Sequence, residues 1–314
     1  AELTSLKKVA QALTKLLQTE TPVGEVLTVI LAGALTNRAS DIHFEAGQDT
    51  NQLRYRVDGN LEPVFEGIPA DVYKMMVSRI KLLANLRLNI TTASQDGRFT
   101  LTLGAVPIEL RISIIPSEFG EGIVMRVLDP RAIEITLTDL GIRQDDLAIV
   151  EEELQAPNGM ILNTGPTGSG KTTTLYAFLR SITAPETKII TIEDPIEYHL
   201  KGIEQTQVEP GSGYTFASGL RSIMRQDPDI ILVGEVRDQE TADIAIQAAL
   251  TGHLVFSTLH TNSASGVIPR LLDLGAPITS IGPALNLVIA QRLVRKLCEQ
   301  CKVPTQELPK EKIE

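Results

Sequence analysis

The segment GPTGSGKT, residues 165–172, constrains the fold of this chain more than any other, because it fits the pattern G-x-x-x-x-G-K-[S/T]. An apolar run at 160–162 precedes it as a short strand, and the residues from Thr173 onward have helical spacing. When a strand is followed by a glycine loop and then a helix, the backbone N–H groups of the loop point toward one place. The positive end of the helix dipole points toward the same place. The segment therefore predicts a phosphate-binding loop inside an α/β domain.

Two side chains of this loop have predicted roles towards a polyphosphate. Lys171 is expected to reach the β- and γ-phosphates, and the Thr172 hydroxyl is expected to ligate Mg²⁺. A glycine-rich turn within a core is the simpler alternative, and the flanking strand and helix argue against it. The predicted nucleotide contacts of the loop are Gly165, Pro166, Thr167, Gly168, Ser169, Gly170, Lys171, Thr172 and Thr173.

Composition limits the other classes of protein to which the chain can belong. Its 314 residues suit about two domains, and 43% of them are apolar. The net charge of −10 argues against broad electrostatic binding of nucleic acid. The longest weakly polar segment, 278–290, is too short and too interrupted to span a bilayer, and no signal-peptide pattern opens the sequence. The sequence has only two cysteines, which favours a reducing cytoplasm.

The first part of the chain has the pattern of a small α+β domain, expected to span 21–130. Residues 1–20 predict a linker helix with one apolar face, and Thr21 and Pro22 predict the start of a second helix, with the proline at its first position. We expect an antiparallel sheet with one apolar face, because apolar and polar residues alternate. Its predicted strands lie at 53–57, 108–114 and 123–128.

From about Ile133 the pattern becomes that of a largely parallel sheet, whose strands are buried on both faces and separated by helices. The linker between the two patterns is expected at 129–138, the α/β domain at 131–297, and a tail with a cysteine pair at 298–314. The predicted strands of the α/β domain are 160–162, 189–192, 230–233 and 254–256.

Two of these strands deliver carboxylates to the carboxyl end of the sheet, where α/β proteins place their ligands. Glu235 follows the strand 230–233 in the manner of a Walker B acid, and it is suited to contact Mg²⁺ through a water molecule. Glu193 ends the strand 189–192, next to Asp194, and is suited to polarise an attacking water. A solvated loop acid is the simpler alternative for each.

Histidines and arginines supply further candidates. His253 and His260 flank the strand 254–256, and His260, at its carboxyl end, is suited to sense a γ-phosphate. A hydrogen-bonded core histidine is the alternative for both. Three arginines of the first domain are suited to bidentate phosphate contact as arginine fingers. Solvated ion pairs are the alternative for them. The alternation of apolar and polar residues places two of them on the outer face of the sheet. The three arginines are Arg98, Arg111 and Arg126, of which the last two lie in the predicted strands.

Cys298 and Cys301 have the spacing of a zinc knuckle. Two thiolates leave a tetrahedral zinc site incomplete, and no further cysteine or suitably spaced histidine follows them. We therefore expect no stable zinc site unless ligands beyond Glu314 complete it.

Taken in order, these motifs make the chain resemble the secretion and type IV pilus assembly ATPases, the traffic ATPase family. The resemblance covers nearly everything from Pro22 to Cys301. It rests on ASDIHFE at 39–45, QDGR at 95–98, the loop at 165–172, TIEDPIEY at 191–198, RQDPD at 225–229 with GEVRD at 234–238, and TGH at 251–253 with HT at 260–261.

The resemblance implies a fold and a chemistry. The implied fold is α/β, with a RecA-like P-loop ATPase domain preceded by a smaller PAS-like α+β domain, in a truncated core without the family's first N-terminal domain. The implied cofactors are ATP and Mg²⁺. By the same resemblance Glu193 is the catalytic base, Glu235 the Walker B acid and His260 a phosphate sensor, and the three arginines reach the nucleotide.

The resemblance also implies an assembly. It points to a cytoplasmic homo-hexamer peripheral to the inner membrane, with a platform protein and a membrane-complex adaptor as partners and no nucleic acid. The cysteine pair favours the assembly or secretion branch over the retraction branch, and pilus, secretion and competence machines all stay open. A nucleic-acid-dependent motor and a non-hydrolysing nucleotide switch are the alternatives. Acidic charge and few aromatic residues argue against the first, and the intact loop and acids argue against the second.

Overall fold

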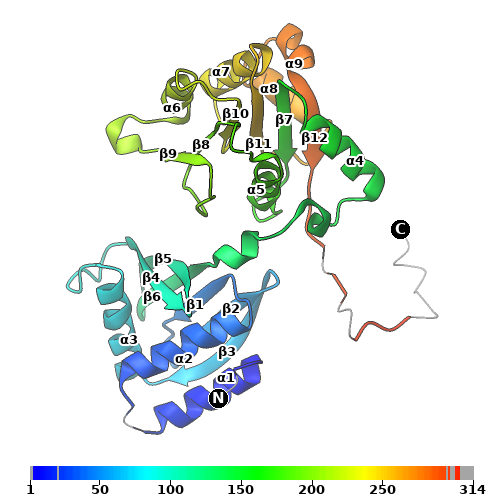
Figure 1. Ribbon diagram of the computed structural model, residues 1–314. Coiled ribbons are helices and arrows are strands. Elements are labelled where there is room, and N and C mark those ends of the chain that lie inside the picture. The colour runs from blue at the N-terminus through cyan, green and yellow to red at the C-terminus, as the bar shows by residue number, and fades with distance from the viewer. Residues whose placement is uncertain (1–2, 20, 295, 298–300, 305–314) are drawn as a thin grey trace. The chain divides into compact units, whose positions relative to one another are not determined.

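The chain divides into two units in the computed structural model, which describes residues 3–19, 21–294, 296–297 and 301–304 (Figure 1). The first unit ends at Thr136 and also includes Glu197–Leu200, and the second begins at Leu137. This boundary falls inside the linker predicted at 129–138. The return of 197–200 to the first unit has no counterpart in the sequence pattern.

The first unit is built on a six-stranded antiparallel sheet in the order β3-β2-β1-β6-β5-β4 (Figure 1). The alternation of apolar and polar residues correctly predicts β2, β5 and β6, and β1, β3 and β4 come in addition. The strands are β1 (Asp41–Glu45), β2 (Asn51–Val57), β3 (Asn60–Ile68), β4 (Gln95–Leu103), β5 (Val106–Ser117) and β6 (Gly120–Leu128).

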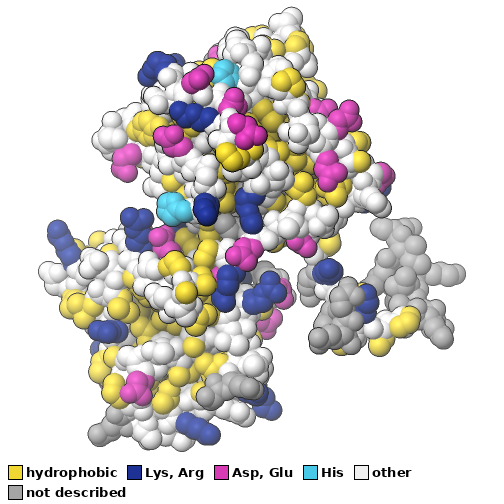
Figure 2. All heavy atoms as spheres, viewed as in Figure 1, with side chains coloured by type: hydrophobic (Ala, Val, Ile, Leu, Met, Phe, Trp, Pro, Cys, Tyr) yellow, Lys and Arg dark blue, Asp and Glu magenta, His cyan; other side chains and the backbone are white. Residues whose placement is uncertain are grey.

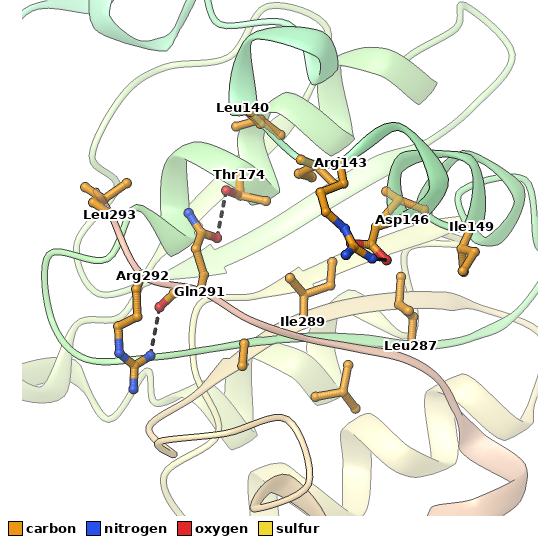
Figure 3. Close-up of a pocket in the computed structure, with 15 residues that line it drawn as sticks. Leu140, Arg143, Asp146, Ile149, Thr174, Leu287, Ile289, Gln291, Arg292 and Leu293 are labelled. Atoms are coloured by element: carbon orange, nitrogen blue, oxygen red, sulfur yellow. Dashed lines mark hydrogen bonds and ion pairs between the residues drawn. The ribbon is translucent and has the colours of Figure 1, made fainter. Parts of the chain in front are cut away.

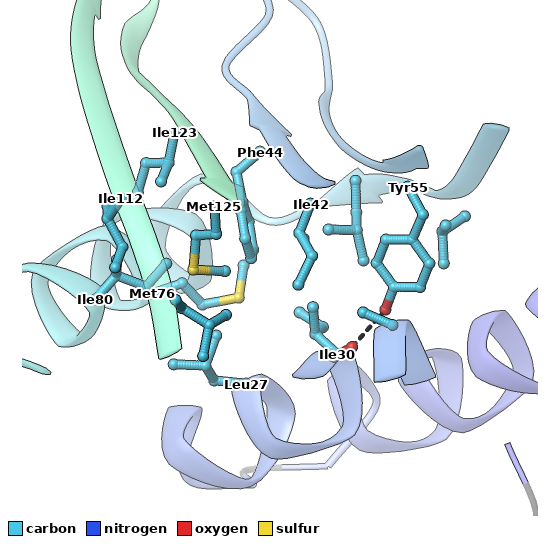
Figure 4. Close-up of a cluster of buried hydrophobic side chains, with 14 of the residues drawn as sticks. Leu27, Ile30, Ile42, Phe44, Tyr55, Met76, Ile80, Ile112, Ile123 and Met125 are labelled. Carbon is cyan, nitrogen blue, oxygen red and sulfur yellow. Dashed lines mark hydrogen bonds between the residues drawn. The ribbon is translucent and has the colours of Figure 1, made fainter. Parts of the chain in front are cut away.

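Three helices bury the apolar face of this sheet: α1 (Leu6–Leu17), α2 (Val23–Thr36) and α3 (Ala70–Leu83). Figure 4 shows Ile30 of α2 and Met76 of α3 meeting strand residues such as Phe44. The expected helix start at Thr21 and Pro22 needs one correction, since Pro22 is the N-cap and the helix begins at Val23. The ring of Pro22 fixes φ at −55°, which suits this position because no N–H is needed there. The PAS-like character of this unit stays a prediction.

Tyr55 provides a test of this core. Its side chain is 0% exposed, and its hydroxyl donates to the Ile30 carbonyl oxygen of α2 at 2.6 Å (Figure 4). Tyr55→Phe is expected to lower the free energy of unfolding by about 1 kcal/mol, the usual net value of one buried hydrogen bond. Urea denaturation followed by circular dichroism measures this change. Tyr214→Phe, whose hydroxyl lies 3.3 Å from Thr206 Oγ1, is the control, and equal midpoints for both variants would contradict the prediction.

The second unit contains a six-stranded, all-parallel sheet in the order β12-β7-β11-β10-β8-β9. The four predicted apolar strands are its central members, β7, β8, β10 and β11, and β9 and β12 come in addition. The strands are β7 (Gly159–Thr164), β8 (Ile189–Glu193), β9 (Glu204–Gln207), β10 (Ile230–Val233), β11 (Leu254–Leu259) and β12 (Leu285–Ala290).

Helices cover both faces of this sheet, which confirms the predicted α/β class. Successive strand residues point to opposite faces. Met160, Ile190 and Val255 pack in one cluster with α6, α7 and α9, whereas the Phe256 ring meets Phe178 of α5 at a centroid distance of 6.4 Å. The helices are α4 (Gln144–Glu153), α5 (Lys171–Ile182), α6 (Phe216–Ile223), α7 (Gln239–Leu250), α8 (Val267–Asp273) and α9 (Ile278–Ala284).

Within the described residues, no helix has both the length and the apolar content to cross a bilayer. Acidic and basic side chains are interspersed on the visible face of each unit (Figure 2).

Candidate nucleotide-binding site

The predicted order of strand, glycine loop and helix is present in the second unit: β7 ends at Thr164, and α5 begins at Lys171. Three glycines of the loop have positive φ, at +147° for Gly165, +77° for Gly168 and +85° for Gly170. Other residues adopt such conformations only with strain. A Cβ atom at Gly165 would also lie 2.5 Å from the Gln291 carbonyl oxygen. The three glycines therefore allow a loop conformation that residues with a side chain would adopt only with strain or, at position 165, with a steric clash.

The loop presents donors that fit a polyphosphate. Lys171 Nζ donates to the carbonyl oxygens of Gly165, at 3.0 Å, and Pro166, at 3.1 Å. Burial lowers the pKa of Lys171, the charge of Glu235 opposes this shift, and Arg292 adds to it. Ser169 Oγ is buried and makes no hydrogen bond within the described part of the chain.

The first turn of α5 completes this donor set. Its backbone N–H groups have no partner inside the helix. Thr172 is exposed in the same turn, so its hydroxyl is accessible to a metal ion. The residues present thus fit a polyphosphate with Mg²⁺.

The carboxyl ends of neighbouring strands bring three motifs together. Glu235 follows β10, and its Oε1 lies 2.5 Å from Arg237 Nη2 while its Oε2 lies 3.6 Å from His260 Nε2. Arg237 also reaches Asp194 Oδ2, at 3.4 Å, beside the end of β8. The hydrogen bond to Glu235 raises the pKa of Arg237. Glu235 and His260 therefore lie close together at the carboxyl ends of β10 and β11.

Glu193 is more buried than an acid in a solvated loop would be. It is the last residue of β8 and is 4% exposed. The Tyr176 hydroxyl donates to its Oε2, and Thr191 Oγ1, at 2.6 Å, and Gln205 Nε2, at 3.0 Å, donate to its Oε1. A buried carboxylate needs such donors, since burying an unpaired charge is costly. The solvated loop acid is therefore the wrong interpretation for Glu193.

His253 lies elsewhere. It precedes β11, at the end opposite His260, and its Nδ1 lies 3.1 Å from the Ala248 carbonyl oxygen. This contact matches the hydrogen-bonded histidine that was the alternative for His253. Of the two cysteines, Cys298 falls outside the described residues, and Cys301 is a free, exposed thiol.

The three predicted arginines form one row in the first unit. In the register of the sheet, Arg98 of β4 is opposite Arg111 of β5, and Arg111 is opposite Arg126 of β6. Directly opposed residues point to the same face, and like charges there are unfavourable unless anions offset them. Acids do so here: Glu197 Oε2 lies 3.0 Å from Arg111 Nη1, Glu109 Oε1 lies 3.4 Å from Arg111 Nε, and Asp41 Oδ1 lies 3.2 Å from Arg126 Nε. The structure thus groups all three arginines, and it also contains the ion pairs of the simpler alternative.

A cavity of about 410 Å³ lies beside α5 (Figure 3). Gln291, which follows β12, connects its wall to the loop region, because the Gln291 Oε1 accepts from Asn163 Nδ2 and from Thr174 Oγ1, each at 2.9 Å. The wall is mostly apolar and includes two arginines. Its residues include Leu140, Ile142, Arg143, Leu287, Ile289, Gln291, Arg292 and Leu293.

Comparison with known proteins settles the family. The sequence profile of the family described as "Type II/IV secretion system protein" matches residues 17–313. The chain belongs to this family. Its membership confirms the resemblance that the motifs of the sequence carry.

Members of the type II/IV secretion family resemble the chain closely. It is 48% identical over 285 residues to the type II secretion system protein E of Pseudomonas aeruginosa, covering 91% of this chain and 57% of that protein. It is 44% identical over 290 residues to the type IV pilus assembly ATPase PilB of Myxococcus xanthus, covering 92% and 51%. The crystal structure of the pilus retraction motor PilT and bound ADP matches with a TM-score of 0.63 and 33% identity, covering 84% of this chain and 77% of that chain. The chain thus spans little more than half the length of the two curated relatives.

Sequence reasoning missed several residues at this family site. Tyr176, Thr191 and Gln205 surround Glu193, and Arg237 contacts Glu235. A signal exists for Thr191, because it lies in β8 two residues before Glu193, whereas Arg237 and Glu235 lie in the loop after β10. Alternate strand residues share a face. Tyr176 and Gln205 reach the site only through the fold.

Proposed function

We propose that this chain is the ATP-hydrolysing core of a hexameric motor that powers type IV pilus assembly or type II secretion. The observation that carries the proposal is the arrangement in one unit of the glycine loop, the buried Glu193, and Glu235 beside His260 at the carboxyl ends of the strands. The names of the relatives support it, since PilB is a pilus assembly ATPase and PilT was crystallised with ADP.

Each side chain has a role in this proposal. The loop N–H groups and Lys171 would bind the β- and γ-phosphates, and Thr172 and Glu235 would hold Mg²⁺. The bound Mg²⁺ supplies charge neutralisation on the phosphate oxygens. Glu193 accepts the proton of the water that attacks the γ-phosphorus, and the bond to the ADP oxygen breaks. His260 senses the γ-phosphate.

The cavity beside α5 is proposed to hold the nucleobase. It adjoins Thr174, in the same helix that begins at Lys171. Apolar walls and guanidinium groups suit a planar heterocycle, which they can contact face to face.

The row of Arg98, Arg111 and Arg126 is proposed to complete the nucleotide site, so that closure of the first unit over ATP is the motor's stroke. Staggered closure around a homo-hexamer would act on an inner-membrane platform protein, with an adaptor holding the ring at the cytoplasmic side. Zinc would bind at Cys298 and Cys301 only together with further ligands.

The test is the rate of Mg-ATP hydrolysis per chain as a function of protein concentration, with sedimentation in the same buffer. We expect the rate to rise as a six-chain species forms, because neighbouring chains complete each site. A substantial hydrolysis rate per chain that does not change with protein concentration, in a protein that sediments as a monomer, would contradict the ring mechanism. Adding DNA is the control for the nucleic-acid-dependent alternative, and a salt-sensitive increase in rate would favour that alternative.

A further inference from the structure

The geometry around Glu193 points to two residues that set the position of the proposed base. We propose that Tyr176 and Gln205 are positioning residues for the Glu193 carboxylate. This inference rests on the proposed function, in which Glu193 takes the proton of the attacking water. Neither residue belongs to a motif on which the family resemblance depends.

The contacts come from three separate elements. Tyr176 lies in α5 and is 0% exposed, Thr191 lies in β8 with Glu193, and Gln205 lies in β9. Tyr176 donates to one carboxylate oxygen, and Thr191 and Gln205 donate to the other. Both oxygens of Glu193 are therefore engaged, which fixes the rotation of the carboxylate plane as well as its location.

Two of the three donors, Gln205 and Tyr176, connect the carboxylate to elements other than its own strand. Thr191 and Glu193 lie on the same face of β8. Thr191 therefore fixes the carboxylate only relative to its own strand. Gln205 reaches across from β9, where it is paired in register with Thr191. Tyr176 reaches across from α5, the helix whose first residue is Lys171. The position of the base relative to the phosphate loop therefore depends on Tyr176.

Hydrogen bonds to a charged group are stronger than those between neutral groups, and a small misplacement of a catalytic group reduces the rate severely. Without the Tyr176 hydroxyl, the carboxylate loses the donor that ties it to α5. The fully buried Tyr176 ring is not part of the exposed loop surface, so nucleotide affinity should not depend on its hydroxyl.

The experiment compares Tyr176→Phe with the parent chain. The kcat for Mg-ATP hydrolysis should fall about tenfold, equivalent to the loss of one hydrogen bond to a charged group. The KM and the affinity for a ribose-labelled fluorescent ATP analogue should stay unchanged. Gln205→Met, in the partly exposed β9, should lower kcat in the same way and provides a second variant if Tyr176→Phe folds poorly. Tyr55→Phe, which loses a buried hydroxyl in the first unit, is the matched control for stability.

A double variant separates positioning from a structural effect. In the Glu193→Gln background, Tyr176→Phe should cause no further loss of single-turnover rate, since the base it positions is gone. An unchanged or increased kcat in both Tyr176→Phe and Gln205→Met would overturn the inference, as would equal losses in the two backgrounds. If Glu193→Gln itself turned over like the parent, the assignment of the base in the proposed function would fail instead.

Discussion

Glu193→Gln is expected to lower the kcat for ATP hydrolysis about a thousandfold, while nucleotide affinity changes little. General-base catalysis of this kind is worth roughly 10²–10⁴ in rate. The amide has the shape of the carboxylate but does not accept a proton at neutral pH. The side chain is 4% exposed, so its charge should contribute little to binding. Steady-state hydrolysis and titration with a fluorescent ATP analogue measure the two quantities separately.

The control for this variant is Glu204→Gln. Glu204 lies in the neighbouring strand β9 and is exposed, so the same chemical change is made close to the site but in solvent. Its kcat should stay within about twofold of the parent, as surface changes usually do. Equal activity of Glu193→Gln and the parent would move the role of base to another acid. Equal losses in both variants would indicate a general effect of charge.

The central strands of the second unit could be predicted because burial on both faces demands an unbroken apolar run. The same reasoning misses β9, Glu204–Gln207, because this edge strand is polar. It also misses β12, because Leu285 continues directly from α9 and no turn signal separates the two elements. Strand β4 is also an edge strand, and the apolar residues on its inner side, Phe99 and Leu101, are only partly buried. Position at the edge of the parallel sheet thus removes the apolar run by which β9 could have been predicted.

The site shows the same division between local and long-range information. Glu235 and His260 could be placed together, because parallel strands end at a common edge. The outward direction of Arg111 and Arg126 follows from alternation alone. The alignment of Arg98 with Arg111 depends on the β4–β5 register, and the contact of Tyr176 with Glu193 depends on how α5 packs on the sheet. Neither the arginine alignment nor the tyrosine contact can be predicted from the local sequence.

Lys171→Ala is expected to abolish ATP hydrolysis and to weaken binding of Mg-ATP by about 10–100-fold. The ammonium is the charged donor that the proposal assigns to the β- and γ-phosphates, and a hydrogen bond to a charged group is worth roughly 1.5–3 kcal/mol. Titration with the fluorescent ATP analogue measures the affinity. Lys201→Ala, at an exposed position of the same unit, is the control and should leave the affinity unchanged.

The stability of Lys171→Ala distinguishes a binding role from a structural one. The acceptors of Lys171 Nζ are the uncharged carbonyl oxygens of Gly165 and Pro166, both at the exit of β7. Removing the amine therefore leaves no buried carboxylate without its partner, which is the change that costs several kcal/mol. The melting temperature should fall by no more than a few degrees. If Lys171→Ala bound nucleotide as tightly as the parent, the loop would not be the phosphate site. If its affinity fell only in proportion to a large loss of melting temperature, Lys171 would hold the loop together rather than the nucleotide.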